Sequence, residues 1–371
     1  MIPDPARVSR ILVRANNWIG DVVMISPAIR ALRETFAHAE IAILARPWVC
    51  DALAANPYFD RLIPYEVPGR HSGLAGRLRL ALELRRRRFD LAVLFQKAFD
   101  AAFLAAAAGI PVRVGHETDR RGFLLTDRVP VGPWSAWRHH VDFFLEVAVA
   151  CGCKPASCRP FFILADEDRS WAEAFLHEAA GQLERGGITR IPGARRQPEH
   201  LVAIHAGGSK GPRAWPAGRF AELAARLFEL KGLVPLVVGD AGDLPAGTEI
   251  VRAVPRALLA AGRTSVRQMG ALIERCRLFV GSDSGPMHIA AALGVPTVGI
   301  FGPGMPEKTA PREAPGGFEA VSLRYPCSPC RQDFFHECDP APSGKPYCLE
   351  EITVDRVASA SLRLLSSPPS P

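Results

Sequence analysis

Short runs of β-branched and other apolar residues alternate with longer, helix-like stretches along the first half of the chain. The short runs are typical of buried strands, and the longer stretches carry apolar residues at helical spacing. Strands that alternate with helices favour a parallel, doubly wound sheet. The predicted strands are residues 11–15, 41–45, 61–65, 91–95 and 112–115, and the predicted helices are 26–36, 74–88 and 137–150.

The same alternation restarts after a break. Cys, Gly, Pro and Ser interrupt it at residues 151–160, which we expect to be a linker. The later strands are predicted at 201–205, 234–238, 278–281 and 297–301, and the helices at 168–183, 217–230, 265–275, 285–293 and 353–365. We therefore expect two Rossmann-like domains with parallel sheets, at 1–160 and 161–352, then a C-terminal helix and frayed tail at 353–371. Ligands are expected in a central cleft between the facing C-terminal edges of the sheets.

The composition is that of a globular chain. Of the 371 residues, 48% are hydrophobic and 22% are charged, which excludes a largely disordered protein. No segment resembles a signal peptide, and none reaches the roughly 20 apolar residues of a membrane span. We therefore expect a cytoplasmic protein whose nine cysteines are reduced thiols or metal ligands. Only six of the 45 basic residues are lysines; the many arginines reflect a compositional bias or a preference for anionic partners.

Two common nucleotide-binding signatures are absent. The sequence has no G-x-x-x-x-G-K-[ST] motif, which argues against a P-loop kinase or ATPase. The first predicted strand is followed by a single glycine, Gly20, where a dinucleotide-binding turn has three. A nicotinamide or flavin dehydrogenase is therefore disfavoured.

Candidate chemistry follows the first predicted strand. The segment N-N-W-I-G-D-V-V-M-I-S-P at residues 16–27 places Asp21 after a strand and a glycine turn. Aspartate is a favoured helix cap, so Asp21 could simply begin the next helix. The alternative is a carboxylate directed into the cleft as a general base.

Two further strand ends carry small and charged residues. In V-G-S-D-S-G-P-M-H at residues 280–288, a helix beginning near Gly285 would offer free N–H groups to phosphate oxygens, unless Asp283 only caps that helix. In I-H-A-G-G-S-K-G-P-R-A-W-P at residues 204–216, Lys210 and Arg213 would face a diphosphate or remain solvated.

Together these stretches resemble the heptosyltransferase family of inverting glycosyltransferases, which build the inner core of lipopolysaccharide. The resemblance rests on W-I-G-D-V-V-M-I-S-P-A-I-R-A-L-R, R-A-W-P, V-G-S-D-S-G-P-M-H-I-A-A-A-L-G-V-P-T-V-G-I-F-G-P and C-S-P-C, in this order between residues 11 and 352. It implies a GT-B architecture, an ADP-L-glycero-D-manno-heptose donor and a lipid-anchored Kdo/heptose acceptor. It also implies inversion at the anomeric carbon without a metal or another cofactor.

The resemblance assigns roles to individual residues. It implies Asp21 as the general base and Asp283 as a contact of the donor sugar. Arg213 stands where the family commonly has lysine. The other implied donor-binding residues are Ser209, Lys210, Asp240, Ser284, Gly285, Met287 and His288. Asp243 is an equal candidate to Asp240 for the carboxylate that holds the nucleotide ribose.

The predicted helix at 74–88 has leucines at 74, 78 and 82 on one face and arginines elsewhere. These arginines would suit an acceptor with carboxylates and phosphates in an anionic bilayer, or they face water. They are Arg77, Arg79, Arg85, Arg86, Arg87 and Arg88. A lipid-anchored acceptor implies a peripheral enzyme at the inner face of the inner membrane.

Other interpretations remain open. Cys327, Cys330, Cys338 and Cys348 could hold a structural zinc, but their spacing is irregular and no aromatic-basic groove accompanies them, so we expect no nucleic-acid partner. A transferase of the same fold could use a UDP-sugar or add a different core heptose. An inactive sugar-nucleotide-binding regulator is a further alternative, which the presence of both Asp21 and Asp283 argues against.

Overall fold

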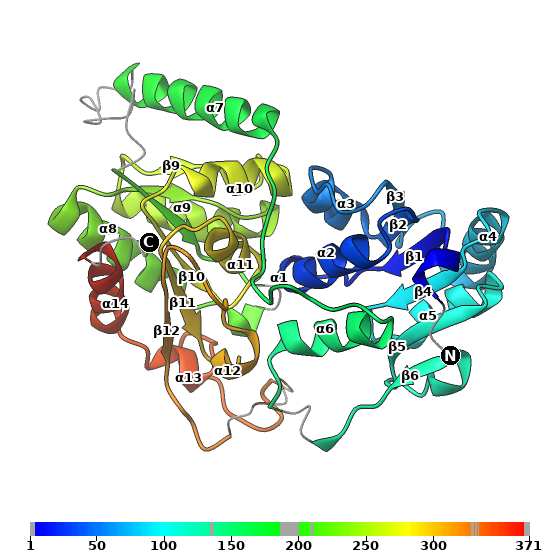
Figure 1. Ribbon diagram of the computed structural model, residues 1–371. Coiled ribbons are helices and arrows are strands. Elements are labelled where there is room, and N and C mark those ends of the chain that lie inside the picture. The colour runs from blue at the N-terminus through cyan, green and yellow to red at the C-terminus, as the bar shows by residue number, and fades with distance from the viewer. Residues whose placement is uncertain are drawn as a thin grey trace. The chain divides into compact units, whose positions relative to one another are not determined.

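The structure is a computed structural model that describes residues 4–133, 137–185, 200–208, 211–327, 330, 332 and 334–366. The chain divides into two compact units, unit 1 at Met1–Phe162 and unit 2 at Ile163–Pro371. Each unit has one parallel sheet with helices on both faces (Figure 1). The expected α/β class with two Rossmann-like sheets is therefore confirmed.

The described residues of unit 1 form six parallel strands in the order β3-β2-β1-β4-β5-β6. In this doubly wound order the chain changes direction across the sheet between β1 and β4. The strands are β1 (Arg10–Arg14), β2 (Glu40–Ala45), β3 (Arg61–Pro64), β4 (Leu91–Leu94), β5 (Val112–His116) and β6 (Asp127–Val129). The helices are α1 (Ile19–Met24), α2 (Ser26–Thr35), α3 (Pro47–Leu53), α4 (Gly73–Arg86), α5 (Phe99–Ala107) and α6 (His140–Ala150).

Successive side chains of the central strands pack on opposite helix layers. Ile11 and Val13 of β1 belong to a buried cluster with α2 and α6, whereas Leu12 belongs to a second cluster with α4 and α5. Both faces of the sheet are thus covered, which explains why its strands are apolar throughout rather than at every second position.

Unit 2 repeats this topology, with strand order β12-β11-β10-β7-β8-β9 and the change of direction between β7 and β10. The strands are β7 (Leu201–His205), β8 (Val234–Val237), β9 (Leu258–Leu259), β10 (Leu278–Ser282), β11 (Thr297–Phe301) and β12 (Phe318–Ser322). The helices are α7 (Asp166–Arg185), α8 (Ala217–Lys231), α9 (Leu244–Ala253), α10 (Val266–Glu274), α11 (Gly285–Ala292), α12 (Pro306–Thr309), α13 (Tyr347–Glu350) and α14 (Val354–Ser366).

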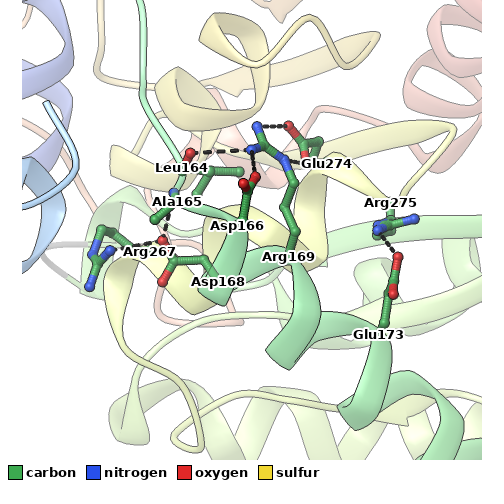
Figure 2. Close-up of polar contacts among 9 residues, drawn as sticks. All are labelled: Leu164, Ala165, Asp166, Asp168, Arg169, Glu173, Arg267, Glu274 and Arg275. Carbon is green, nitrogen blue, oxygen red and sulfur yellow. Dashed lines mark hydrogen bonds and ion pairs between the residues drawn. The ribbon is translucent and has the colours of Figure 1, made fainter. Parts of the chain in front are cut away.

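Ion pairs attach α7 to α10 in unit 2 (Figure 2). The guanidinium of Arg169 donates to both carboxylate oxygens of Glu274, at 2.9 and 3.0 Å. Buried Asp168 accepts from Arg267 at 2.9 Å and from the backbone N–H of Ala165 at 3.0 Å, so it also fixes the start of α7. These contacts join the first helix after the division to the body of unit 2.

A buried histidine makes the stability of unit 1 depend on pH. His116 lies at the end of β5, stacks on Phe143 of α6 at 3.6 Å between ring centroids, and places Nε2 2.6 Å from the Phe143 carbonyl oxygen. Burial, with the charges of Lys97 and Arg121, lowers the pKa of His116 to about 4. The unfolded chain therefore takes up this proton first as the pH falls, and the folded state loses stability between about pH 6.5 and 4.

We expect this histidine to account for a loss of roughly 3 kcal/mol in the free energy of unfolding across that range. His116→Gln keeps a hydrogen-bond donor but cannot be protonated, so its unfolding free energy should fall less steeply. Chemical denaturation at several pH values measures both slopes, with exposed His177→Gln as the matched control. Equal slopes for wild type and His116→Gln would show that another group controls the pH dependence.

Candidate functional site

The candidate residues gather where each sheet changes its winding direction. In unit 1, the segments after β1 and β4 carry Asp21 and Lys97, and these strands are neighbours. In unit 2, the segments after β7 and β10 carry Arg213 and Asp283, again on neighbouring strands. Adjacent loops leave in opposite directions at such a point and open a crevice, which is where ligands bind in this class of sheet. Each unit thus has one candidate site at the carboxyl edge of its sheet.

Asp21 lies in the first turn of α1 rather than in a turn before a helix, which corrects the expected local structure. The residue that precedes the helix is Trp18, and Asp21 does not cap it. The carboxylate instead accepts a 3.0 Å hydrogen bond from the Asn16 side-chain amide. Its other oxygen lies 3.7 Å from Nδ1 of His140, the first residue of α6. The side chain is 23% exposed, so it is held by neighbours yet open to a ligand.

The surroundings of Asp21 favour its ionised form. Burial alone would raise its pKa, but His140, the Asn16 amide and the charge of Lys97 outweigh burial and hold the pKa of the carboxyl below its usual value. Lys97 itself lies over the Phe143 ring, 4.6 Å from its centroid. The carboxylate is consequently unprotonated at neutral pH, which is the state that a general base requires.

A cationic and aromatic network occupies the same edge of the unit 1 sheet. Tyr65, after β3, donates a 2.6 Å hydrogen bond to Asp100, which also pairs with Arg77 of α4. The guanidinium groups of Arg14 and Arg46 lie 5.0 and 5.1 Å from the centre of the Tyr65 ring. Burial lowers the pKa of Arg14 to about 10, which leaves it charged at neutral pH. This edge of the sheet is suited to an anionic ligand.

Two exposed tryptophans flank the network. Trp18 is 61% exposed and Trp48 is 44% exposed. The Trp48 indole N–H donates to the Asn17 carbonyl oxygen at 2.9 Å, which fixes the ring beside the start of α1. Flat apolar rings next to a carboxylate and cations are suited to a ligand with both charged groups and C–H faces.

In unit 2, the structure joins two of the predicted donor residues to each other. The guanidinium of Arg213, in the segment after β7, forms an ion pair with the carboxylate of Asp283, after β10. The Asp283 side chain is 8% exposed and that of Arg213 is 20% exposed. A Cβ atom at Gly304 would lie 2.3 Å from the Asp283 carboxylate, so this glycine permits the close approach of the loop after β11. Asp283 is therefore held by Arg213 instead of capping α11.

A hydrogen-bonded chain that the sequence did not reveal lies beside this pair. His205, the last residue of β7, places Nδ1 3.0 Å from the Ser284 hydroxyl and Nε2 3.3 Å from the Asp243 carboxylate. Burial would raise the pKa of Asp243, but His205 and the Asp240 backbone N–H hold it below its usual value. The Asp243–His205–Ser284 chain thus orients a hydroxyl at the start of α11.

Glycines at two strand ends make room for the Asp243 carboxylate. A Cβ atom added to Gly207 would lie 1.8 Å from this carboxylate, and one added to Gly239 would lie 2.2 Å from it. Gly239 also has a φ of +147°, which other residues rarely adopt. Asp243 is thereby held against His205, whereas Asp240 is exposed and its carboxylate accepts from Gly242 of its own turn at 2.7 Å. Of the two carboxylates predicted to hold the nucleotide ribose, that of Asp240 is the more exposed to solvent.

The other residues predicted to bind the donor lie at the start of α11 or outside the described residues. Ser284 precedes α11, and the backbone N–H groups of Gly285 and Met287 lie in the first turn of that helix, where they have no acceptor within the helix. The Met287 side chain is fully buried against β11, so only its backbone could contact a ligand. His288 is also buried, at 5% exposure. Ser209 and Lys210 lie outside the described residues.

We expect His205→Ala to weaken the donor side of the site. The substitution leaves the nearly buried Asp243 carboxylate without its histidine partner and leaves the Ser284 hydroxyl with only its 2.9 Å bond to the Ser282 carbonyl oxygen, so the free energy of unfolding should fall by about 1–3 kcal/mol. Nucleotide-sugar binding should weaken by about tenfold, the effect of one hydrogen bond of this kind. Calorimetry and thermal melting measure both effects, with exposed His177→Ala as the control. Unchanged binding and melting would show that the chain of three side chains has no role.

The cysteine loop is a separate feature of unit 2. Burial and the neighbouring thiols of Cys327, Cys330 and Cys338 raise the pKa of Cys348 to about 12, so its thiol stays protonated at neutral pH. Among the residues that the structure describes, no group of three or more His, Cys, Asp or Glu side chains is arranged to hold a metal ion. None of these cysteines lies at a strand end that carries the candidate site.

We therefore expect this loop to be structural. Purified protein should contain less than one zinc per chain, and a chelator should leave catalysis largely intact. Elemental analysis, with activity measured before and after chelation, tests both statements. Full zinc occupancy would contradict them and would make the four thiols ligands.

Known proteins resemble this chain over most of its length. The sequence profile of glycosyltransferase family 9 (heptosyltransferase) matches residues 77–337. Lipopolysaccharide heptosyltransferase 2 of Escherichia coli strain K12 is 30% identical over 314 residues, which are 81% of this chain and 85% of that protein. The heptosyltransferase 2 of Salmonella typhimurium is also 30% identical, over 309 residues, with the same coverage.

Solved structures share the fold. The E. coli ADP-heptose lipopolysaccharide heptosyltransferase II has a TM-score of 0.73 at 26% identity, with 96% of this chain and 98% of that chain covered. A family 9 glycosyltransferase from Veillonella parvula has a TM-score of 0.80 at 23% identity and covers 98% of both chains. In the part of the chain that the structure describes, no helix combines the length and apolarity that crossing a bilayer requires.

Proposed function

The chain belongs to glycosyltransferase family 9, the heptosyltransferases, and on this premise we propose that it transfers heptose from ADP-heptose to the Kdo/heptose inner core of lipopolysaccharide. It is a glycosyltransferase of lipopolysaccharide core biosynthesis, and it resembles the enzymes named heptosyltransferase 2. The finer proposal adds the donor, the acceptor and Asp21 as the general base. The observation that carries it is the Asp21 carboxylate, which accepts a hydrogen bond from Asn16 and lies 3.7 Å from His140 Nδ1 where the unit 1 sheet changes its winding direction.

We assign the donor to unit 2. The E. coli relative of known structure is an ADP-heptose enzyme by its name. Arg213, the free N–H groups at the start of α11 and the oriented Ser284 hydroxyl supply the positive charge and donors that a diphosphate needs. Asp240 is the carboxylate we assign to the ribose. Lys210 and Ser209 remain expected contacts of the phosphates.

We assign the acceptor to unit 1. Its inner-core sugars carry carboxylates and phosphates, which the arginines and Lys97 at the edge of that sheet would attract. The rings of Trp18 and Trp48 would pack on sugar faces. Because the acceptor is anchored by lipid, we place the reaction at the inner surface of the inner membrane.

The proposed reaction is a single displacement at the anomeric carbon of the heptose. The acceptor oxygen forms the new bond while the bond to the ADP oxygen breaks, and Asp21 removes the proton of the acceptor hydroxyl. Negative charge grows on the departing diphosphate, where Arg213 and the start of α11 stabilise it. No covalent enzyme intermediate and no metal takes part in this sequence, so the product has the inverted configuration.

A panel of donors and acceptors tests this function. The protein is incubated with ADP-heptose or with UDP-sugars, together with Kdo-lipid A that carries zero or one heptose, and the product mass is measured. We expect one added heptose from ADP-heptose only, and on the acceptor that already holds one heptose. Transfer from a UDP-sugar would support another transferase of this fold, and tight ADP-heptose binding without a product would support a regulator.

A further inference from the structure

An exposed row of leucines runs along α4 of unit 1. Leu74, Leu78 and Leu82 are 64%, 44% and 57% exposed. Their spacing of four residues places them on one face of the helix. The buried side of α4 is formed by other small and apolar residues, Gly76, Leu80, Ala81 and Leu84, of which Leu80 and Leu84 belong to the core cluster with the sheet. The leucine row therefore contributes nothing to the core, although a helix of a globular protein normally directs its apolar stripe inward.

Arginines without carboxylate partners surround this row. Residues 70–88 contain seven arginines and one glutamate. Arg70 pairs with that glutamate, Glu83, and Arg77 pairs with Asp100. The remaining five are exposed, and within the described residues none of them lies within 4 Å of a carboxylate. They are Arg79, Arg85, Arg86, Arg87 and Arg88. The leucine row and these five arginines are called the α4 patch below.

Exposed aromatic rings lie at the start of the neighbouring helix α5 and in the short turn Gly122–Leu124. α4 and α5 lie side by side in unit 1, and Arg77 of α4 forms its ion pair with Asp100 in the first turn of α5 (Figure 1). Phe99, beside Asp100, is 39% exposed, and its ring centroid lies 6.1 Å from that of Phe123, which is 70% exposed. Apolar side chains are thus presented by two adjacent elements.

We propose that the α4 patch binds the surface of an anionic lipid bilayer. Leucines on an exposed helix face can enter the boundary between headgroups and acyl chains, while arginines keep their guanidinium groups at the level of the phosphates. The charge of the patch selects this occupant: a second copy of the chain would bring the same unpaired arginines together, whereas an anionic membrane neutralises them.

This inference deepens the proposed function, because it identifies the surface that holds the enzyme at the membrane of its acceptor. It rests on the lipid-anchored acceptor of that proposal, but its test uses neither donor nor acceptor. If the protein binds vesicles but transfers no heptose, the proposed role of the α4 patch is supported and only the proposed substrates are refuted.

Sedimentation with vesicles measures the binding directly. The full-length protein is mixed with vesicles of phosphatidylethanolamine and phosphatidylglycerol, or of phosphatidylcholine alone, and the bound fraction gives a partition coefficient. We expect binding to the anionic vesicles that weakens as salt is added. Leu74→Gln/Leu78→Gln/Leu82→Gln should lower the partition coefficient at least about tenfold, because the row loses its apolar area. Arg85→Gln/Arg86→Gln should lower it by about fivefold per arginine.

Control variants at other surface positions test whether the loss of vesicle binding is specific to the α4 patch. Val149→Gln/Leu230→Gln/Leu244→Gln removes three exposed apolar side chains from other helices, and Arg252→Gln/Arg356→Gln removes two exposed arginines from unit 2. Both should bind as wild type does, and all variants should melt as wild type does. Equal binding to both vesicle types, or equal loss in patch and control variants, overturns the proposal. The proposal is also overturned if the wild-type protein forms a dimer that does not bind vesicles and the triple leucine variant is monomeric.

Discussion

Asp21→Asn should lower the rate of heptose transfer by about 10²–10⁴-fold, the usual contribution of a positioned general base. The amide cannot accept the proton of the acceptor hydroxyl, yet it has nearly the shape of the carboxylate. It can also still accept the hydrogen bond from Asn16, so the fold should persist. Donor affinity should stay close to that of wild type because the donor is assigned to unit 2. Calorimetry with ADP-heptose and single-turnover transfer measure the two quantities.

The control and the pH dependence sharpen this prediction. Asp51→Asn changes an aspartate on α3 of the same unit and should transfer at the wild-type rate. A base must be unprotonated, so activity is lost as the pH falls through its pKa. The pKa of Asp21 lies below its usual value, so this loss should occur only below about pH 4. A transfer rate for Asp21→Asn equal to that of wild type would exclude Asp21 as the general base.

Arg213→Ala should weaken ADP-heptose binding and slow transfer together, by on the order of 2.7–4 kcal/mol in the barrier. The ion pair with Asp283 adds a second effect. Removal of the guanidinium leaves a carboxylate that is 8% exposed without its partner, which is costly for stability. Arg213→Lys keeps the charge and should retain much of the activity. Melting temperatures and calorimetry with ADP and with ADP-heptose follow each variant.

The ion pair also changes what is expected of Asp283. If Asp283 contacted only the sugar, Asp283→Ala would impair the recognition of heptose and leave the binding of ADP unchanged. Because this carboxylate positions Arg213, we expect some loss of ADP binding as well. The double variant Arg213→Ala/Asp283→Ala should be less impaired than the sum of the two single variants. Strict additivity would contradict the coupling, and exposed Arg252→Ala should behave as wild type.

The repeating order of strands and helices could be predicted because buried parallel strands are apolar on both faces. Residues 201–205 and 297–301 coincide with β7 and β11, and no other predicted element differs by more than three residues at an end. The sequence did not predict α5, whose alanine-rich composition has no helical periodicity. It also did not predict β12, a short edge strand after a loop rich in proline and glycine.

The site was harder to predict because its partners come from distant segments. Asp21 and Asp283 stand out beside strand ends, but the ion pair between Asp283 and Arg213 joins residues 70 positions apart. His205 is a single histidine at a strand end, and its role depends on Ser284, 79 positions later. The leucine spacing on α4 identified a helix face, but Leu80, Ala81 and Leu84 are also apolar. Only packing decides which of these faces the core.

The anomeric configuration of the transferred heptose tests the central claim most directly. A single displacement, with Asp21 as base and no covalent intermediate, must invert the configuration of the donor. The product of ADP-heptose and the Kdo-lipid acceptor is isolated, and the one-bond carbon–hydrogen coupling at the new anomeric centre is measured by NMR. We predict the configuration opposite to that of the donor. Retention would require two displacements and an enzyme nucleophile, and it would contradict the account.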